Sequence, residues 1–179
     1  MTKFIIPYHI TDEDYVAFND HHLRHTPYGR KVVRNGRVAL VALSVFILIF
    51  FWFQHQDLSI LLWQAIGMGA VCLFSCFFFH RSMMRTIRRR VQKSHKTGKE
   101  LFSPRGELTV DFENRTITDK GEKFHLEVPF SSVQEMYETD TAFYIYIHQQ
   151  GGFIIPYHLF LHTDELAAFR KSAKAAFQP

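Results

Sequence analysis

Two apolar stretches decide the fold of this chain: VALVALSVFILIFFWF at residues 38–53 and LSILLWQAIGMGAVCLFSCFFF at residues 58–79. Neither contains an Asp, Glu, Lys or Arg. As a helix, the second stretch reaches about 33 Å, enough to cross a hydrocarbon core of about 30 Å, whereas the first reaches about 24 Å and is short by itself. We therefore expect a hairpin of two membrane helices, at about residues 37–54 and 58–80, with a tight loop at residues 54–57.

The composition of the chain limits the class of protein. The chain has 179 residues, of which 47% are hydrophobic and 19 are Phe. Because the two stretches hold much of this apolar excess, the rest divides into an N-terminal arm and a C-terminal part, which excludes one large soluble enzyme core. A structured arm precedes the first stretch and no small-x-small cleavage site ends it, so we expect it to remain in the mature chain.

Basic residues flank the hairpin asymmetrically. Four Lys or Arg residues stand between residues 30 and 37, eight stand between residues 81 and 99, and none lies in the loop at residues 54–57. The positive-inside rule therefore predicts a multi-pass cell-membrane protein with both termini in the cytoplasm. A transporter or channel is disfavoured, because neither stretch carries the ionisable groups that such proteins place within the membrane.

Small residues predict how the second helix packs. Ala65, Gly69, Cys72 and Cys76 recur at steps of four, three and four, which places them on one face of a helix. Such a stripe lets helices approach closely, so we expect it to meet the first helix or a second copy of the chain in a homodimer. We interpret both cysteines as packing residues, not as disulfide or metal sites.

A basic segment follows the second stretch and has two interpretations. One is that it faces anionic lipid headgroups, with each base near the surface contributing about 1 kcal/mol. The other is that the bases only enforce topology. Helical spacing of Met83, Ile87 and Val91 predicts that the helix continues through this segment, and membrane-flanking bases explain the sequence pI of about 9.1 without nucleic acid. The predicted lipid-facing residues are Arg81, Arg85, Arg88, Arg89, Arg90 and Lys93.

Beyond Gly106 the hydrophobic period changes from helical to alternating. Short strands are indicated by the alternation of apolar and polar residues, most clearly at residues 142–148. A helix with Thr163 as its N-cap ends the chain, and its predicted buried stripe is Leu166, Phe169, Ala173 and Phe177. The fold class is therefore membrane α+β. We expect an arm at residues 1–29, the hairpin with its basic extension at 30–99, and at 100–179 a small antiparallel β-barrel or sheet capped by the C-terminal helix.

One hexapeptide occurs twice. Phe-Ile-Ile-Pro-Tyr-His stands at residues 4–9 and again at 153–158, and Thr-Asp-Glu follows each copy, at Thr11 and at Thr163. The first copy also has a capping pair, Thr11 with Asp14. Similar local geometry is one explanation. We favour another, in which the arm docks on the C-terminal domain and completes its fold, because so short an arm cannot bury its own apolar face.

The chain resembles the YcxB-like family of bacterial membrane proteins. The residues that carry the resemblance are Ile10-Thr11-Asp12-Glu13-Asp14-Tyr15, Val128-Pro129-Phe130-Ser131-Ser132-Val133, Phe143-Tyr144-Ile145-Tyr146-Ile147 and Phe153-Ile154-Ile155-Pro156. The resemblance implies a pleckstrin-homology-like (PH-like) terminal domain behind two membrane helices. It implies no catalytic residue and no settled activity.

The sequence offers few residues for chemistry. We predict no catalytic residue, cofactor or metal site, and we interpret His21, His22 and His25 as a solvated helix end. We expect a non-catalytic module that presents its β-domain to a protein or lipid partner. The alternative is an immunity protein against a toxin that acts on the bilayer. The proposed partner surface is Tyr144, Tyr146 and His148, which would be exposed if the alternate residues face the core. The alternative is that the two tyrosines lie beneath the docked N-terminal arm.

Overall fold

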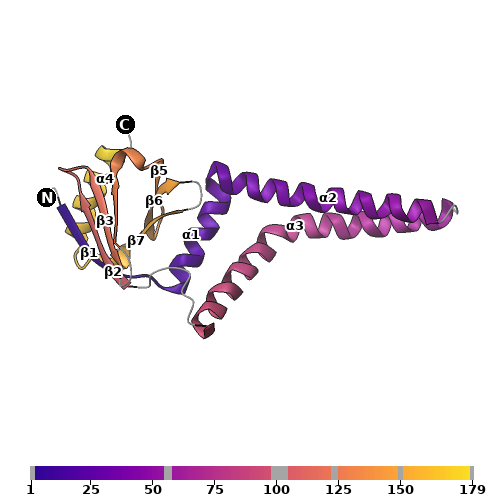
Figure 1. The fold of residues 1–179 in the computed structure, drawn as a ribbon, viewed down its shortest axis with the longest axis horizontal. Coiled ribbons are helices and arrows are strands. Elements are labelled where there is room, and N and C mark those ends of the chain that lie inside the picture. Colours follow the sequence, from indigo (N-terminus) through magenta and orange to yellow (C-terminus); the bar gives the residue numbers. More distant parts are fainter. Residues whose placement is uncertain (1–2, 55–57, 98–104, 122–124, 149–150, 178–179) are drawn as a thin grey trace. The chain divides into compact units, whose positions relative to one another are not determined.

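The computed structural model describes residues 3–54, 58–97, 105–121, 125–148 and 151–177 (Figure 1). The expected loop at residues 54–57 therefore lies almost wholly outside the described residues. The chain divides into two compact units. One, which we call the β-domain, combines Met1–Phe18 with Val91–Pro179. The other, which we call the hairpin, spans Asn19–Arg90.

Two long helices make up most of the hairpin. They are α2 at Pro27–Gln54 and α3 at Leu58–Thr97, and α1 at Asp12–His25 precedes them (Figure 1). Both α2 and α3 are long and apolar enough to cross a membrane, and none of their apolar windows is buried among the described residues. A core helix of a soluble protein would hide such a surface, so these helices suit a membrane.

Local chemistry explains where α2 begins, at Pro27 and not near residue 37 as the hydrophobic pattern predicts. The hydroxyl of Thr26 accepts a hydrogen bond of 3.0 Å from the backbone N–H of Gly29, and Pro27 takes the first helical position. Both features are typical of helix starts. Asp20 links α1 to α3, because its carboxylate lies 2.7 Å from Nε2 of His80. The same carboxylate lies 2.9 Å from Nε of Arg24 on α1 itself.

The β-domain contains two antiparallel sheets. The first has the order β1-β2-β3-β4, with bounds Lys3–His9, Arg105–Asp111, Thr116–Gly121 and His125–Pro129. The second has the order β5-β6-β7, with bounds Glu135–Glu138, Ala142–His148 and Gly151–Pro156. Two short 3-10 helices follow β4 and β7, namely η1 (Phe130–Ser132) and η2 (Tyr157–Leu159), and α4 (Thr163–Phe177) ends the domain.

The sheets do not close on each other, so the expectation of a barrel is wrong and that of open sheets holds. Among the described strands β4 pairs with β3 alone and β5 pairs with β6 alone. Because η1 turns the chain after Pro129, β5 starts a new sheet and does not extend the first. Alternation in a sequence predicts strands and their faces, but it does not say whether the last strand meets the first.

Aromatic side chains fill the core between the sheets and α4. Phe169 of α4 is fully buried, and its ring centroid lies 5.3 Å from that of Phe4 on β1 and 5.2 Å from that of Phe143 on β6. Ala173 is also fully buried. The predicted stripe of α4 is thus confirmed at these two positions, whereas Leu166 and Phe177 are partly buried at its edge.

The N-terminal arm contributes β1 to the first sheet. β1 runs antiparallel to β2, with Phe4 opposite Val110 and Ile6 opposite Leu108. All four of these side chains are buried in the core. Pro7 lies within β1, which is tolerated because β1 is an edge strand. The arm docks as the repeated hexapeptide suggests, although its partner is β2 and not β7, the strand with the second copy.

Candidate functional site

The basic segment of α3 has exposed charges, although Val91 within it is buried. The side chains of all six predicted lipid-facing residues are exposed, and α3 contains no Asp or Glu from Leu58 to Thr97. Their positive charges therefore have no acidic neighbour on their own helix. That these six residues face anionic headgroups stays a prediction. Two of them, Arg81 and Arg85, also line a groove.

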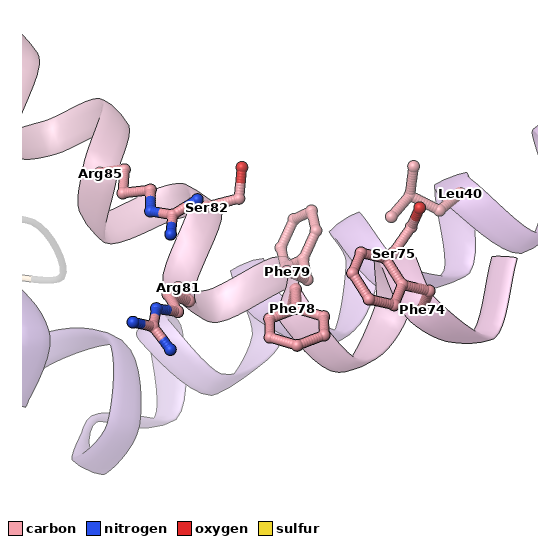
Figure 2. Close-up of a pocket in the computed structure, with 8 residues that line it drawn as sticks. All are labelled: Leu40, Phe74, Ser75, Phe78, Phe79, Arg81, Ser82 and Arg85. Carbon is pink, nitrogen blue, oxygen red and sulfur yellow. The ribbon is translucent and has the colours of Figure 1, made fainter. Parts of the chain in front are cut away.

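A groove opens on the hairpin between α2 and α3, with a volume of about 550 Å³ (Figure 2). We call it the membrane groove. Figure 2 shows the basic and hydroxyl groups of Arg81, Ser82 and Arg85 at one end. The remaining lining residues are Phe78 and Phe79 in the middle and Leu40, Phe74 and Ser75 toward the other end. The groove thus carries three aromatic rings along its length and becomes cationic where the apolar stretch ends.

The predicted small-residue stripe does not form the close contact between α2 and α3. Ala65 and Gly69 are exposed, and a Cβ added at Gly69 would have no described atom within 4 Å, so the expected packing of these two against the first helix is wrong. Cys72 and Cys76 are half-buried. The helices instead approach at Gly36 of α2, where an added Cβ would collide with the ring of Phe79. Packing of the stripe against a second copy stays a prediction.

The predicted partner surface on β6 is covered, which corrects the expectation of exposed tyrosines. Tyr144 and Tyr146 are each only 3% exposed, because Phe18 of α1 packs on them. The Phe18 ring stacks on Tyr146 at 5.2 Å and meets Tyr144 edge-on at 5.4 Å. Burial raises the pKa of the Tyr146 hydroxyl. His148 ends β6, and its side chain lies outside the described residues.

Other apolar groups surround the contact of Phe18, and we call the whole set the aromatic face. Tyr137 of β5 and Ile154 of β7 pack on it and are half-buried, and the ring of Tyr137 lies 5.7 Å from that of Tyr146. Alternation along β6 correctly separates these tyrosines from the core side of the sheet. It cannot reveal the covering helix, since Phe18 lies far away in the sequence. The repeated hexapeptide was the signal that the arm is close.

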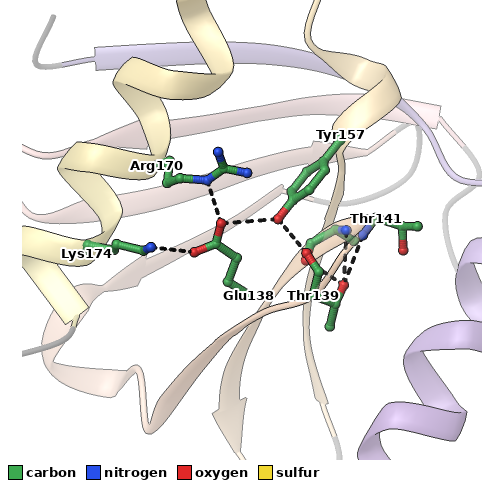
Figure 3. A network of polar contacts seen from close by, with 7 residues as sticks. Glu138, Thr139, Thr141, Tyr157, Arg170 and Lys174 are labelled. Atoms are coloured by element: carbon green, nitrogen blue, oxygen red, sulfur yellow. Dashed lines mark hydrogen bonds and ion pairs between the residues drawn. The ribbon is translucent and has the colours of Figure 1, made fainter. Parts of the chain in front are cut away.

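A charged cluster lies where β5, η2 and α4 meet (Figure 3). Glu138 at the end of β5 pairs with Arg170 of α4 and lies 2.9 Å from Nζ of Lys174. Tyr157 donates its hydroxyl to the backbone carbonyl of Thr139 at 2.6 Å, and Arg170 lies 5.5 Å from the centre of its ring. Burial acts to raise the pKa of Glu138, but the two cations outweigh it and lower that pKa.

A second tyrosine–carboxylate pair lies in the first sheet. Tyr8 of β1 donates to the carboxylate of Asp119 on β3 at 2.8 Å, across β2. The bond passes over Gly106, where an added Cβ would stand 2.6 Å from the Tyr8 hydroxyl oxygen. Burial raises the pKa of Asp119, and the hydrogen bond from Tyr8 opposes that rise only in part. This carboxylate and Gly106 were missed in the sequence, because their roles depend on strand register.

The expectation of a solvated helix end is wrong for His21 and His22, which are half-buried on α1, whereas His25 is exposed. The rings of His21 and His25 are 4.5 Å apart, and burial together with the charges of His25 and His22 lowers the pKa of His21 to about 4. Within the described part of the chain no group of three His, Cys, Asp or Glu residues could hold a metal ion. The candidate sites therefore offer three kinds of surface: the aromatic face, the cationic end of the membrane groove, and the polar contacts around Glu138 and Asp119.

A comparison with protein families finds a match for one segment of the chain. Residues 112–171 match the family model described as YcxB-like protein, which confirms the resemblance seen in the sequence. The match runs from the turn after β2 into α4, and so it omits β1, β2 and the hairpin. Neither the search of curated proteins nor that of solved structures found a match.

Proposed function

We propose that this chain, which carries a YcxB-like domain at residues 112–171, is a multi-pass membrane protein that presents a non-catalytic, PH-like binding module to a protein partner in the cytoplasm. The observation that carries the proposal is the aromatic face with Phe18 seated on it. The membrane placement and the choice of partner rest on separate arguments.

The pairing of β1 with β2 supports the membrane topology. β1 precedes both membrane-length helices and β2 follows them, yet the two strands are neighbours in one sheet. Since a sheet cannot form across a bilayer, both ends of the hairpin must lie on the same side of the membrane. The basic residues that flank the helices favour the cytoplasmic side.

The PH-like interpretation is supported by the arrangement of the β-domain. Two antiparallel sheets of four and three strands, followed by one C-terminal helix, enclose a single core. Such a scaffold is rigid and holds its outer faces in fixed positions. The outer face of β5-β6-β7 is aromatic, which is unusual for a surface that alternation directs away from the core.

A protein partner fits this aromatic face better than a lipid headgroup does. Phe18 already shows what the surface accepts, namely an aromatic side chain carried on a helix. Tyrosine-rich surfaces that bind such anchors are typical of protein interfaces. We infer that a partner helix with an aromatic anchor takes the place of Phe18.

Site-specific photocrosslinking tests the proposal. A photoreactive phenylalanine analogue replaces Tyr137, at the rim of the aromatic face, in full-length protein in native membranes. We expect a protein adduct that increases at least about threefold in Phe18→Ala, because this change uncovers the face. The same analogue at Lys120, an exposed position in the first sheet, is the matched control.

Several outcomes test the proposal. The proposal is contradicted if Tyr137 gives no adduct in either background, or if Lys120 gives the same adducts. Phe18→Leu keeps an apolar cover and should behave like the parent.

A protease experiment in the same cells tests the topology. A tag at the C-terminus should resist protease added outside and be cut after lysis; cutting without lysis would refute the topology. The alternative of an immunity protein stays a prediction that a neighbouring toxin gene would favour.

A further inference from the structure

The membrane groove combines two kinds of surface that a phospholipid also combines. Its middle is lined by the rings of Phe78 and Phe79, and Leu40 of α2 lies toward one end (Figure 2). The opposite end carries the guanidinium groups of Arg81 and Arg85. Acyl chains fill apolar grooves through dispersion, whereas a phosphate is bound by guanidinium groups.

The charges at this end are suited to an anion. Arg81 and Arg85 are four residues apart, so they stand one above the other on the same helix face. Ser82 between them adds a hydroxyl that can donate to a phosphate oxygen. The charge is not cancelled within the helix, because α3 contains no acidic residue.

The depth of the groove also matches a lipid. Phe79 is the last residue of the second apolar stretch, and Arg81 is the first Lys or Arg after it. In a helix that leaves a bilayer, this is the level at which headgroup phosphates meet the acyl region. A molecule seated here would place its charge at the arginines and its chain along the phenylalanines.

We propose that the membrane groove binds one anionic glycerophospholipid, with its phosphate on Arg81 and Arg85 and one acyl chain between Leu40 and Phe78. This site lies on the hairpin and is separate from the aromatic face. It relies on the membrane placement proposed above but not on the protein-binding role. It also distinguishes two arginines from the rest of the basic segment, since Arg88, Arg89 and Arg90 do not line the groove.

Native mass spectrometry of the full-length protein tests this site. Detergent-solubilised protein is mixed with equal amounts of phosphatidylglycerol, which is anionic, and phosphatidylcholine, which is zwitterionic. We expect one retained phosphatidylglycerol, at least about fivefold in excess over phosphatidylcholine. The double variant Arg81→Gln/Arg85→Gln should lose this preference. The control Arg88→Gln/Arg89→Gln removes the same charge outside the groove and should keep it within about twofold.

Two further arms separate the parts of the proposal. Leu40→Trp fills the apolar end without changing charge and should reduce lipid retention, and soluble glycerophosphoglycerol, which lacks acyl chains, should not compete. The site is refuted if the parent shows no preference, if the Arg88 and Arg89 control loses as much as the groove variant, or if glycerophosphoglycerol displaces the lipid. Extraction of the protein from vesicles by salt would instead refute the membrane placement itself.

Discussion

The two copies of Phe-Ile-Ile-Pro-Tyr-His form equivalent strands in different sheets. The first forms β1 and the second lies in β7, and each is an edge strand with one described neighbour. In both copies the Phe and the second Ile are buried: Phe4 and Ile6 are 2% exposed, and Phe153 and Ile155 are 6% and 0% exposed. The shared sequence thus sets the strand and its inward face, whereas the ends differ, because β1 runs on to His9 and β7 ends at Pro156.

The surroundings of the two copies differ. Ile5 points outward and is 53% exposed, whereas its counterpart Ile154 packs on the aromatic face. Tyr8 bonds a carboxylate that has a raised pKa, and Tyr157 lies beside a carboxylate that two cations hold at a lowered pKa. Local sequence therefore dictates the strand, and the neighbouring elements dictate exposure and charge.

The largest expected effect tests whether the first copy is as integral to the fold as the second. Phe4→Ala and Phe153→Ala should each lower the free energy of unfolding by about 3–5 kcal/mol, because each empties a buried aromatic site. Ile5→Ala should change it by less than about 0.5 kcal/mol. Thermal unfolding in detergent micelles, followed by near-UV circular dichroism, measures all three. A cost for Phe4→Ala no greater than that for Ile5→Ala would show that β1 is only loosely attached.

A smaller effect should come from the glycine that lets Tyr8 reach its partner. Gly106→Ala places a methyl group 2.6 Å from the Tyr8 hydroxyl and 2.7 Å from the backbone oxygen of Lys120. We expect a loss of about 1–3 kcal/mol and faster amide exchange in β1. Hydrogen-exchange mass spectrometry reports both. Gly67→Ala, at a site with no described atom within 4 Å, is the control. An equal loss of stability there would show that the effect of Gly106→Ala does not come from crowding of Tyr8.

The smallest expected effects have opposite signs for the two carboxylates. Asp119 has a raised pKa, so the folded state gains stability as pH falls through that pKa, and Asp119→Asn should stabilise the protein at pH 7 by up to about 1 kcal/mol. Glu138 has a lowered pKa, so its contribution is present at pH 7 and is lost as pH falls through that pKa. Glu138→Gln should therefore destabilise by about 0.5 kcal/mol at pH 7.

Denaturation at several pH values checks these signs. Both differences from the parent protein should shrink below about pH 4, where carboxyl groups are protonated. The contrast is between Asp119, whose pKa is raised by burial, and Glu138, whose pKa is lowered by two cations. It would be wrong if the two variants changed stability in the same direction at pH 7.

The sequence predicted elements better than surfaces. Hydrophobic length identified both membrane-length helices, and alternation identified β6 with its bounds. Docking of the arm offered a cover for Tyr144 as an alternative, but the covering residue, Phe18, could not be named, because it depends on contacts between residues far apart in the chain. The small residues of α3 misled for a related reason. A stripe marks a face that permits close approach, but the actual contact at Gly36 depends on how the helices cross.

The position of the hairpin within the chain has a consequence for synthesis. β1 leaves the ribosome first, and β2 follows only after both helices have been translated. At about 5–20 residues per second, the nascent β1 waits on the order of 5–20 s for its partner. The first sheet can close only after both helices have left the translation machinery. A chain whose helices stall is left with unpaired strands, the state on which chaperones and proteases act.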